Sequence, residues 1–126
     1  MPYKILYVED NHDNQLIVKK ALEARGYHFI WAQNGSFALS MARQEKPDLI
    51  LLDINLPDVD GYEVARKIRK SRRKKLRYVP IIALTANALR GDAEKALAAG
   101  CDMYIAKPIN IRELWSRVAN FLPNTV

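Results

Sequence analysis

The sequence predicts a three-layer α/β domain in which a parallel five-stranded sheet is covered by helices on both faces. Short apolar runs alternate with segments of helical periodicity along the 126 residues. The runs are apolar on consecutive residues, as expected for strands buried on both faces of a parallel sheet. Hydrophobic residues make up 49% of the chain, which excludes a disordered protein. Neither a linker nor a repeat divides residues 1–126, so we expect one domain with right-handed crossovers.

The first half of the chain contains two strand–helix units. Residues 4–8 (KILYV) form an apolar run that ends in two acids. Residues 13–25 then place apolar side chains at helical spacing, up to the C-cap residue Gly26. A second strand is predicted over 28–32 (HFIWA), and a second helical segment follows the turn dipeptide at 34–35.

A third unit follows Pro47, which interrupts the chain before the apolar run 48–53 (DLILLD). Residues 56–61 have the composition of a loop, and Asp60, near the end of this loop, can cap the start of a third helix. The apolar positions of that third helix are Val64, Ala65 and Ile68.

Two more units complete the predicted sheet. Strands are predicted over 79–85 (VPIIALT) and 102–106 (DMYIA). An Ala-rich helix is predicted over 90–99, and an amphipathic helix over 111–121. The total of five strands and five helices fits the flavodoxin-like strand order 2-1-3-4-5.

Polar residues stand where the predicted strands end. Glu9 and Asp10 follow the first strand, Asp53 ends the third, Thr85 ends the fourth and Lys107 follows the fifth. In open α/β sheets, functional residues gather beyond the carboxyl ends of the strands, so the proposed order brings these five side chains to one edge.

Three carboxylates held close together repel one another unless a cation joins them. Hard oxygen ligands favour Mg²⁺, which keeps several waters and suits phosphoryl chemistry. A carboxylate can then act as a nucleophile and form an aspartyl phosphate. Taken singly, each residue has an ordinary explanation, such as a helix cap, a turn former or a solvated lysine. Their combination at the ends of separate strands predicts a phosphoryl-transfer site.

Four segments of the chain carry a resemblance to a known family. They are ILYVEDN, PDLILLDINLPDVDGYEV, PIIALTANA and AGCDMYIAKPI. In this order and spacing the chain resembles, from Lys4 to about Leu122, the response-regulator receiver domains of two-component signalling, in their single-domain form. The resemblance implies a phosphoacceptor rather than an enzyme, with intrinsic autodephosphorylation.

The resemblance also implies a role for each site residue. Asp53 would accept the phosphoryl group from a phosphohistidine of a sensor histidine kinase or a histidine phosphotransfer protein. Asp10 and Asp53 would bind Mg²⁺ directly, Glu9 through water, and Asn55 through its backbone carbonyl, with Mn²⁺ as a substitute metal. Thr85 would hold a phosphoryl oxygen.

Further residues match the switch machinery of the family. Lys107 would hold a phosphoryl oxygen beside a cis peptide bond to Pro108, and Tyr104 matches the aromatic switch position that moves with Thr85. Gly61 matches the glycine after the active-site loop. Two positions that tune autodephosphorylation in the family are Asn55 and Asn87. The downstream protein target would contact the region 88–121, namely 88–99, 103–106 and 110–121.

Three rival enzyme or cofactor classes fit less well. A haloacid-dehalogenase-like phosphatase also uses an Asp nucleophile after a strand, but it needs a second Asp where this chain has Asn55. A flavodoxin would need a phosphate-binding loop after the first strand, where this chain has acids. A P-loop NTPase would need a Gly-rich GK[ST] motif, which the chain lacks.

The net charge of +6 comes from one segment. Nine of the 20 basic residues fall within 66–77, which leaves 11 against 14 acidic residues in the rest of the chain. A nucleic-acid-binding protein is therefore an alternative, although no recognition motif accompanies the segment. We favour a solvated surface here, or a surface that docks an acidic partner.

No apolar run is long enough to span a bilayer, and no signal peptide is visible. Cys101 is the only cysteine of the chain, so we expect it to pack as a small hydrophobe. Trp31 and Trp115 are expected to be partly exposed packing residues. These features predict a cytoplasmic protein that has no contact with a membrane. Separately, we expect a monomer or a weak dimer.

Overall fold

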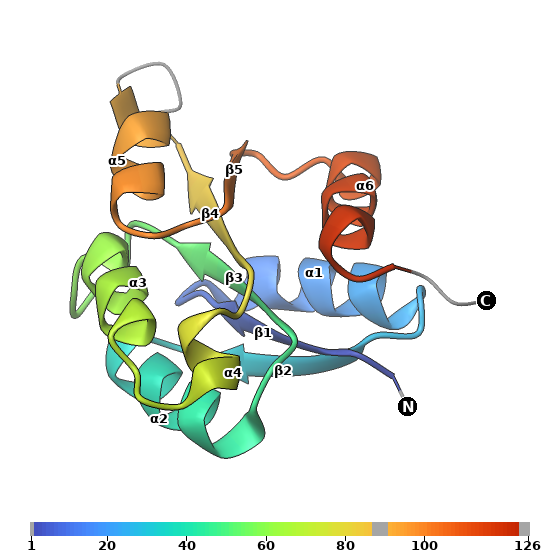
Figure 1. The fold of residues 1–126 in the computed structure, drawn as a ribbon. Coiled ribbons are helices and arrows are strands. Elements are labelled where there is room, and N and C mark those ends of the chain that lie inside the picture. Colours follow the sequence, from blue (N-terminus) through green and yellow to red (C-terminus); the bar gives the residue numbers. More distant parts are fainter. Residues whose placement is uncertain (1, 87–90, 124–126) are drawn as a thin grey trace.

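The sheet has the predicted strand order. A computed structural model describes residues 2–86 and 91–123, and its five parallel strands lie in the order β2-β1-β3-β4-β5 (Figure 1). The strands are β1 (Lys4–Val8), β2 (His28–Ala32), β3 (Leu49–Asp53), β4 (Ile81–Thr85) and β5 (Met103–Ala106). In the register between β3 and β4, Asp53 pairs with Leu84, so Asp53 and Thr85 lie at the same edge of the sheet.

Helices cover both faces of the sheet. One face is covered by α1 (His12–Glu23) and α6 (Ile111–Phe121). The other is covered by α2 (Gly35–Glu45), α3 (Gly61–Arg69), α4 (Lys74–Arg77) and α5 (Ala93–Ala98). The three-layer prediction is therefore confirmed, with helices on either side of the strands in Figure 1.

The predicted number of helices was wrong by one. The described part of the chain has six helices, because the one-turn helix α4 lies between α3 and β4. Its sequence KKLR contains one apolar residue, Leu76, which is 6% exposed. A single apolar position has no periodicity, so tertiary packing of Leu76 forms this turn rather than a pattern visible in the sequence. Several other predicted ends differ from the observed ones by a few residues, as is usual for element boundaries.

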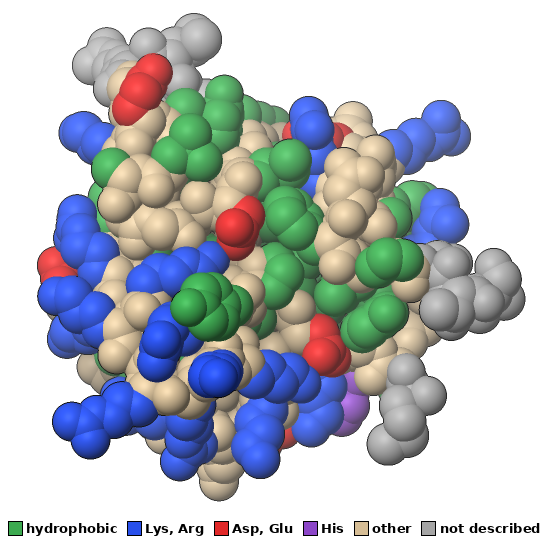
Figure 2. All heavy atoms as spheres, viewed as in Figure 1, with side chains coloured by type: hydrophobic (Ala, Val, Ile, Leu, Met, Phe, Trp, Pro, Cys, Tyr) green, Lys and Arg blue, Asp and Glu red, His purple; other side chains and the backbone are tan. Residues whose placement is uncertain are grey.

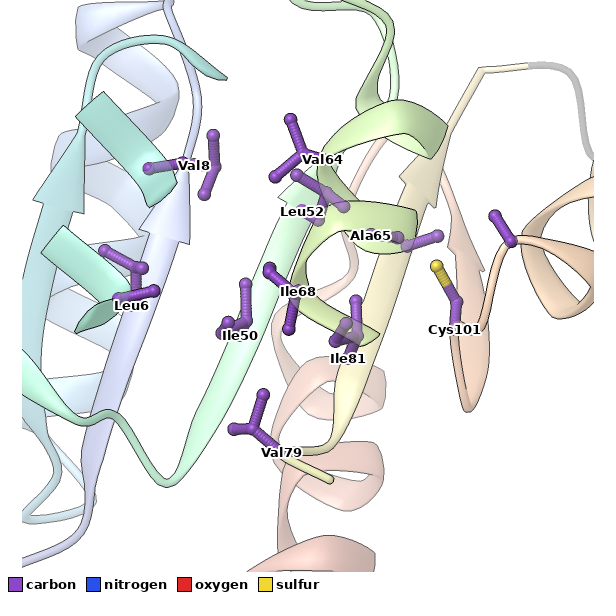
Figure 3. Close-up of a cluster of buried hydrophobic side chains, with 14 of the residues drawn as sticks. Leu6, Val8, Ile50, Leu52, Val64, Ala65, Ile68, Val79, Ile81 and Cys101 are labelled. Atoms are coloured by element: carbon purple, nitrogen blue, oxygen red, sulfur yellow. The ribbon is translucent and has the colours of Figure 1, made fainter. Parts of the chain in front are cut away.

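The core consists of two apolar layers that alternate along the strands. Ile50 and Ile81 lie beside Val64 and Ile68 of α3, in an apolar layer that also contains Leu6 (Figure 3). Their neighbours along the strands belong to the second layer, on the side of α1 and α6. Every residue of β3 and β4 is buried. Each fully buried aliphatic side chain contributes about 1.5–3 kcal/mol, so these strands hold the site edge rigidly.

Helix caps fix the segments next to the sheet edge. Asn11 accepts a hydrogen bond from the Asn14 backbone N–H at the start of α1. Asp60 does the same for Tyr62 at the start of α3. The end of α1 is followed by Gly26 with a φ of 82°, a conformation that favours glycine.

Three smaller predictions can be compared with the structure. Cys101 is buried among apolar side chains, and this burial raises the pKa of its thiol to about 11. Trp31 and Trp115 are partly exposed, as expected. Among the described residues, no helix combines the length and the apolar character needed to cross a membrane.

Candidate functional site

Three acids meet at the carboxyl edge of the sheet. Glu9, Asp10 and Asp53 each offer a carboxylate oxygen, and these oxygens lie within 4.8 Å of one another. Asp53 is the last residue of β3, and Glu9 and Asp10 directly follow β1, its neighbour in the sheet. Glu9 and Asp53 are 1% and 2% exposed, whereas Asp10 faces solvent. The site is therefore anchored in the protein and open on one side.

Glu9 is held by neighbours that the sequence did not identify. Its Oε1 accepts hydrogen bonds from the Tyr7 hydroxyl at 2.9 Å and from Asn14 Nδ2 at 3.3 Å. Its Oε2 accepts the Asn11 backbone N–H at 3.3 Å, and its carbonyl accepts the indole N–H of Trp31 at 2.7 Å. Burial, together with the negative charge of Glu9, raises the pKa of Tyr7, so the phenol stays protonated and donates to Glu9.

Lys107 provides the positive charge at the centre of the site. Its Nζ lies 2.8 Å from Asp53 Oδ2 and 3.8 Å from Glu9 Oε1. The backbone N–H of Lys107 donates to the Thr85 carbonyl at 2.8 Å, which fixes the start of the β5–α6 loop. The peptide bond between Lys107 and Pro108 is cis.

The charges at the site do not balance. Three carboxylates face one ammonium group among the described residues. Two of these carboxylates are buried, and a buried charge is costly unless it is compensated. An oxygen-ligated divalent cation would supply the missing positive charge, and this donor set fits Mg²⁺. Glu9, Asp10 and Asp53 are the residues that can hold it.

The loop between β3 and α3 packs closely against Asp53. Asp53 Oδ1 accepts the Asn55 backbone N–H at 3.0 Å. A Cβ at Gly61 would lie 2.6 Å from the Asp53 carbonyl oxygen and from Ile54 Cα, so only glycine fits there. Asn55 also forms an isolated antiparallel bridge with Asp60. The loop thus turns tightly beside the central carboxylate.

Thr85 lies at the end of β4, one residue beyond Leu84, which is the register partner of Asp53. Its side chain is 2% exposed, and its hydroxyl donates to Asp92 Oδ2 at 2.7 Å. Asp92 was not predicted, and its distance from Thr85 in the sequence carries no motif that could have identified it. Tyr104 on β5 is 39% exposed, an outward position, and Asn87 lies outside the described residues.

The comparisons with known proteins agree with this geometry. The family model described as response regulator receiver domain matches residues 5–119. The polar-differentiation response regulator DivK of Brucella anthropi is 41% identical over 122 residues, which cover 97% of this chain and 98% of that protein.

Two solved structures have the same fold. The receiver domain of the sensor histidine kinase PA1611 of Pseudomonas aeruginosa is 40% identical, with a TM-score of 0.88, over 98% of this chain and 100% of that one. That structure has a magnesium ion coordinated in the active site cleft. The chemotaxis response regulator CheY4 of Vibrio cholerae is 26% identical, with a TM-score of 0.88, over 96% of this chain and 99% of that one.

Proposed function

Because the chain belongs to the response regulator receiver domain family, we propose that Asp53 accepts a phosphoryl group in a Mg²⁺-dependent reaction. The observation that carries this proposal is the position of Asp53. Its carboxylate is buried at the end of β3, shares a site with Glu9 and Asp10, and lies 2.8 Å from Lys107.

The donor is a phosphohistidine of a sensor histidine kinase or a histidine phosphotransfer protein. An oxygen of Asp53 forms a bond to phosphorus while the N–P bond breaks, and the electron pair of that bond stays on the imidazole. Asp10, Asp53 and the carbonyl of Asn55 would hold Mg²⁺ directly and Glu9 through water, and the ion would supply positive charge for the transferring group. Mn²⁺ offers the same coordination chemistry.

Lys107 and Thr85 then hold the phosphoryl oxygens. Phosphorylation adds about 1.5–2 negative charges and new acceptor oxygens beside Asp53. Lys107 already reaches Asp53, so it can move its ammonium group onto a phosphoryl oxygen over a short distance. The hydroxyl of Thr85 would donate a hydrogen bond to another phosphoryl oxygen. This bond would bias an existing conformational equilibrium of the loop after β4.

The output is a change in a protein-binding surface. Tyr104 and Leu97 are exposed side chains on neighbouring elements, β5 and α5. An inward movement of Tyr104 that follows Thr85 would change this surface. We assign the contact with a downstream target to 88–99, 103–106 and 110–121, of which 88–90 lie outside the described residues. We place the protein in the cytoplasm as a monomer or weak dimer.

Intact-mass measurement after incubation with acetyl phosphate and Mg²⁺ tests the phosphoacceptor. We expect one phosphoryl adduct, lost in Asp53→Asn and lost when EDTA removes the metal, with slow spontaneous decay. Asp58→Asn is a matched control, because Asp58 lies in the adjacent loop but outside the acidic cluster. An adduct that survives in Asp53→Asn would refute the assignment.

A second binding function is favoured by the surface charge. We define the basic face as the nine basic side chains of residues 66–77. Figure 2 shows Lys and Arg side chains gathered over the lower and left parts of the molecule, where α2, α3 and α4 lie. Three of the nine form ion pairs with carboxylates, at 2.8–3.1 Å. The other six have no carboxylate within 4.0 Å among the described residues: Lys67, Lys70, Arg72, Arg73, Lys74 and Arg77.

We propose that this face docks an acidic protein surface. At its edge, a largely apolar pocket of 460 Å³ is lined by Arg43, Lys46 and Arg73 together with Leu76, so cations and apolar atoms are available together. Uncompensated like charges repel one another, and an acidic partner relieves this repulsion.

Binding of a poly-glutamate peptide and of a DNA duplex distinguishes the two partner classes. We expect binding of the peptide that is lost when Arg72, Arg73, Lys74 and Lys75 become Ser. A control that replaces Lys19, Lys20, Lys95 and Arg112 with Ser lowers the net charge equally and should keep binding. Tighter, salt-dependent binding of DNA would instead support a nucleic acid partner.

A further inference from the structure

Asp92 occupies an unusual position beside the phosphorylation site. It directly precedes α5, where an aspartate commonly caps the helix with its side chain, but it makes no such cap. Its carboxylate turns toward the sheet edge, where Oδ2 accepts the Thr85 hydroxyl at 2.7 Å and Oδ1 accepts the Tyr62 hydroxyl at 3.3 Å. One carboxylate therefore joins the end of β4 to the first turn of α3.

The surroundings of Asp92 strengthen this link. Tyr62 is 7% exposed, and its hydroxyl also lies 3.4 Å from the Asp92 carbonyl. Burial, followed by the charge of Asp92, raises the pKa of Tyr62 to about 12, so the phenol remains a donor at neutral pH. Asp92 and Tyr62 line an open pocket of 570 Å³ together with the loop that contains Asn55. The carboxylate thus lies beside the loop that follows Asp53.

A hydroxyl group has a single proton to donate. In the structure Thr85 donates to Asp92. In the phosphorylated form, under the proposed function on which this inference rests, Thr85 donates to a phosphoryl oxygen instead. The two acceptors compete for the same proton, so activation must break the contact with Asp92. A ligand shifts a conformational equilibrium only by its difference in affinity for the two states.

We propose that Asp92 is a positioning residue that holds Thr85 in the unphosphorylated arrangement and so opposes activation. We call this role a latch: Asp92 holds the Thr85 hydroxyl by a hydrogen bond and does not itself bind the phosphoryl group. Removal of the Asp92 carboxylate then leaves Thr85 without this competing acceptor. Binding of a phosphoryl group, or of a chemical equivalent, becomes tighter as a result.

The test measures binding of beryllofluoride in the presence of Mg²⁺. Binding is followed through the fluorescence of Trp31, whose indole N–H is hydrogen-bonded to the Glu9 carbonyl at the site. We expect Asp92→Ala to bind beryllofluoride roughly ten-fold more tightly than wild type. Ten-fold corresponds to about 1.4 kcal/mol, the size of a modest hydrogen bond to a charged group. Asp92→Asn keeps the size of the side chain and leaves a weaker hydrogen-bond acceptor. It should therefore increase the affinity for beryllofluoride, but by less than Asp92→Ala does.

Two controls separate a latch from a simple charge effect. Glu94→Ala removes one negative charge two residues away and should leave the affinity within two-fold of wild type. In a Thr85→Ala background, Asp92→Ala should have no effect, because the shared proton is gone. Equal tightening in that background or in Glu94→Ala overturns the latch, as does unchanged affinity in both Asp92 variants. Absence of beryllofluoride binding to the wild-type protein would contradict the proposed function itself.

Discussion

The hydrogen bond between Tyr7 and Glu9 gives a quantitative prediction for Tyr7→Phe. The two side chains are 0% and 1% exposed, and the hydroxyl lies 2.9 Å from Oε1. A hydrogen bond to a charged group contributes about 1.5–3 kcal/mol net. Glu9 keeps its weaker contacts with Asn14 at 3.3 Å and Lys107 at 3.8 Å after the change. We therefore expect the variant to lose about 1–2 kcal/mol of unfolding free energy.

Urea denaturation in EDTA at neutral pH measures this loss without the contribution of a metal. Tyr78→Phe is the matched control, because Tyr78 is 71% exposed and the same hydroxyl is removed there. The Mg²⁺ affinity of Tyr7→Phe should also fall about ten-fold or more, since groups that orient metal ligands have effects of that size. A loss of stability below about 0.5 kcal/mol, equal to that of Tyr78→Phe, would refute the idea that Tyr7 stabilises the Glu9 carboxylate.

Other parts of the site give further predictions. Gly61→Ala places a Cβ 2.6 Å from backbone atoms of Asp53 and Ile54, so we expect a loss of about 1–3 kcal/mol in urea denaturation and a lower yield of phosphoryl adduct. Mg²⁺ at a hundred times its Kd should stabilise the wild-type protein by about 2.7 kcal/mol, and this gain should be absent in Asp10→Ala. Asp58 accepts the backbone N–H groups of Gly35 and Ser36, which lowers its pKa. Because the folded pKa is lowered, Asp58→Ala should destabilise the protein at pH 7, and this effect should be present above the ordinary pKa of 3.8. It should disappear as the pH falls through the lowered value, which denaturation curves at several pH values can follow.

The residues at the strand ends could be predicted because their signal is local. A buried parallel strand is a short apolar run, so the first polar residue after it, such as Asp53, marks the functional edge. The alternation of strands and helices fits the order 2-1-3-4-5 without fixing it, and the structure confirms that order.

The partners of those residues could not be predicted in the same way. Tyr7 looks like an ordinary strand residue, and the one signal is that Tyr7 and Glu9, two residues apart, share a face of the extended chain. Asp92 meets Thr85 and Tyr62 through the packing of α5 and α3, a contact that no spacing in the sequence encodes. Long-range contacts of this kind depend on tertiary packing.

The sheet separates the two proposed binding functions in space. The acidic site follows the carboxyl ends of β1 and β3, whereas the basic face connects the end of α3 to the beginning of β4. A five-residue strand such as β4 is roughly 13–16 Å long at about 3.3 Å per residue. That separation exceeds the Debye length of about 8 Å at physiological ionic strength, so interactions through the solvent between the two regions are largely screened. We therefore expect an acidic partner docked there to bind with little dependence on phosphorylation, while the surface around Tyr104 and α5 would respond to it.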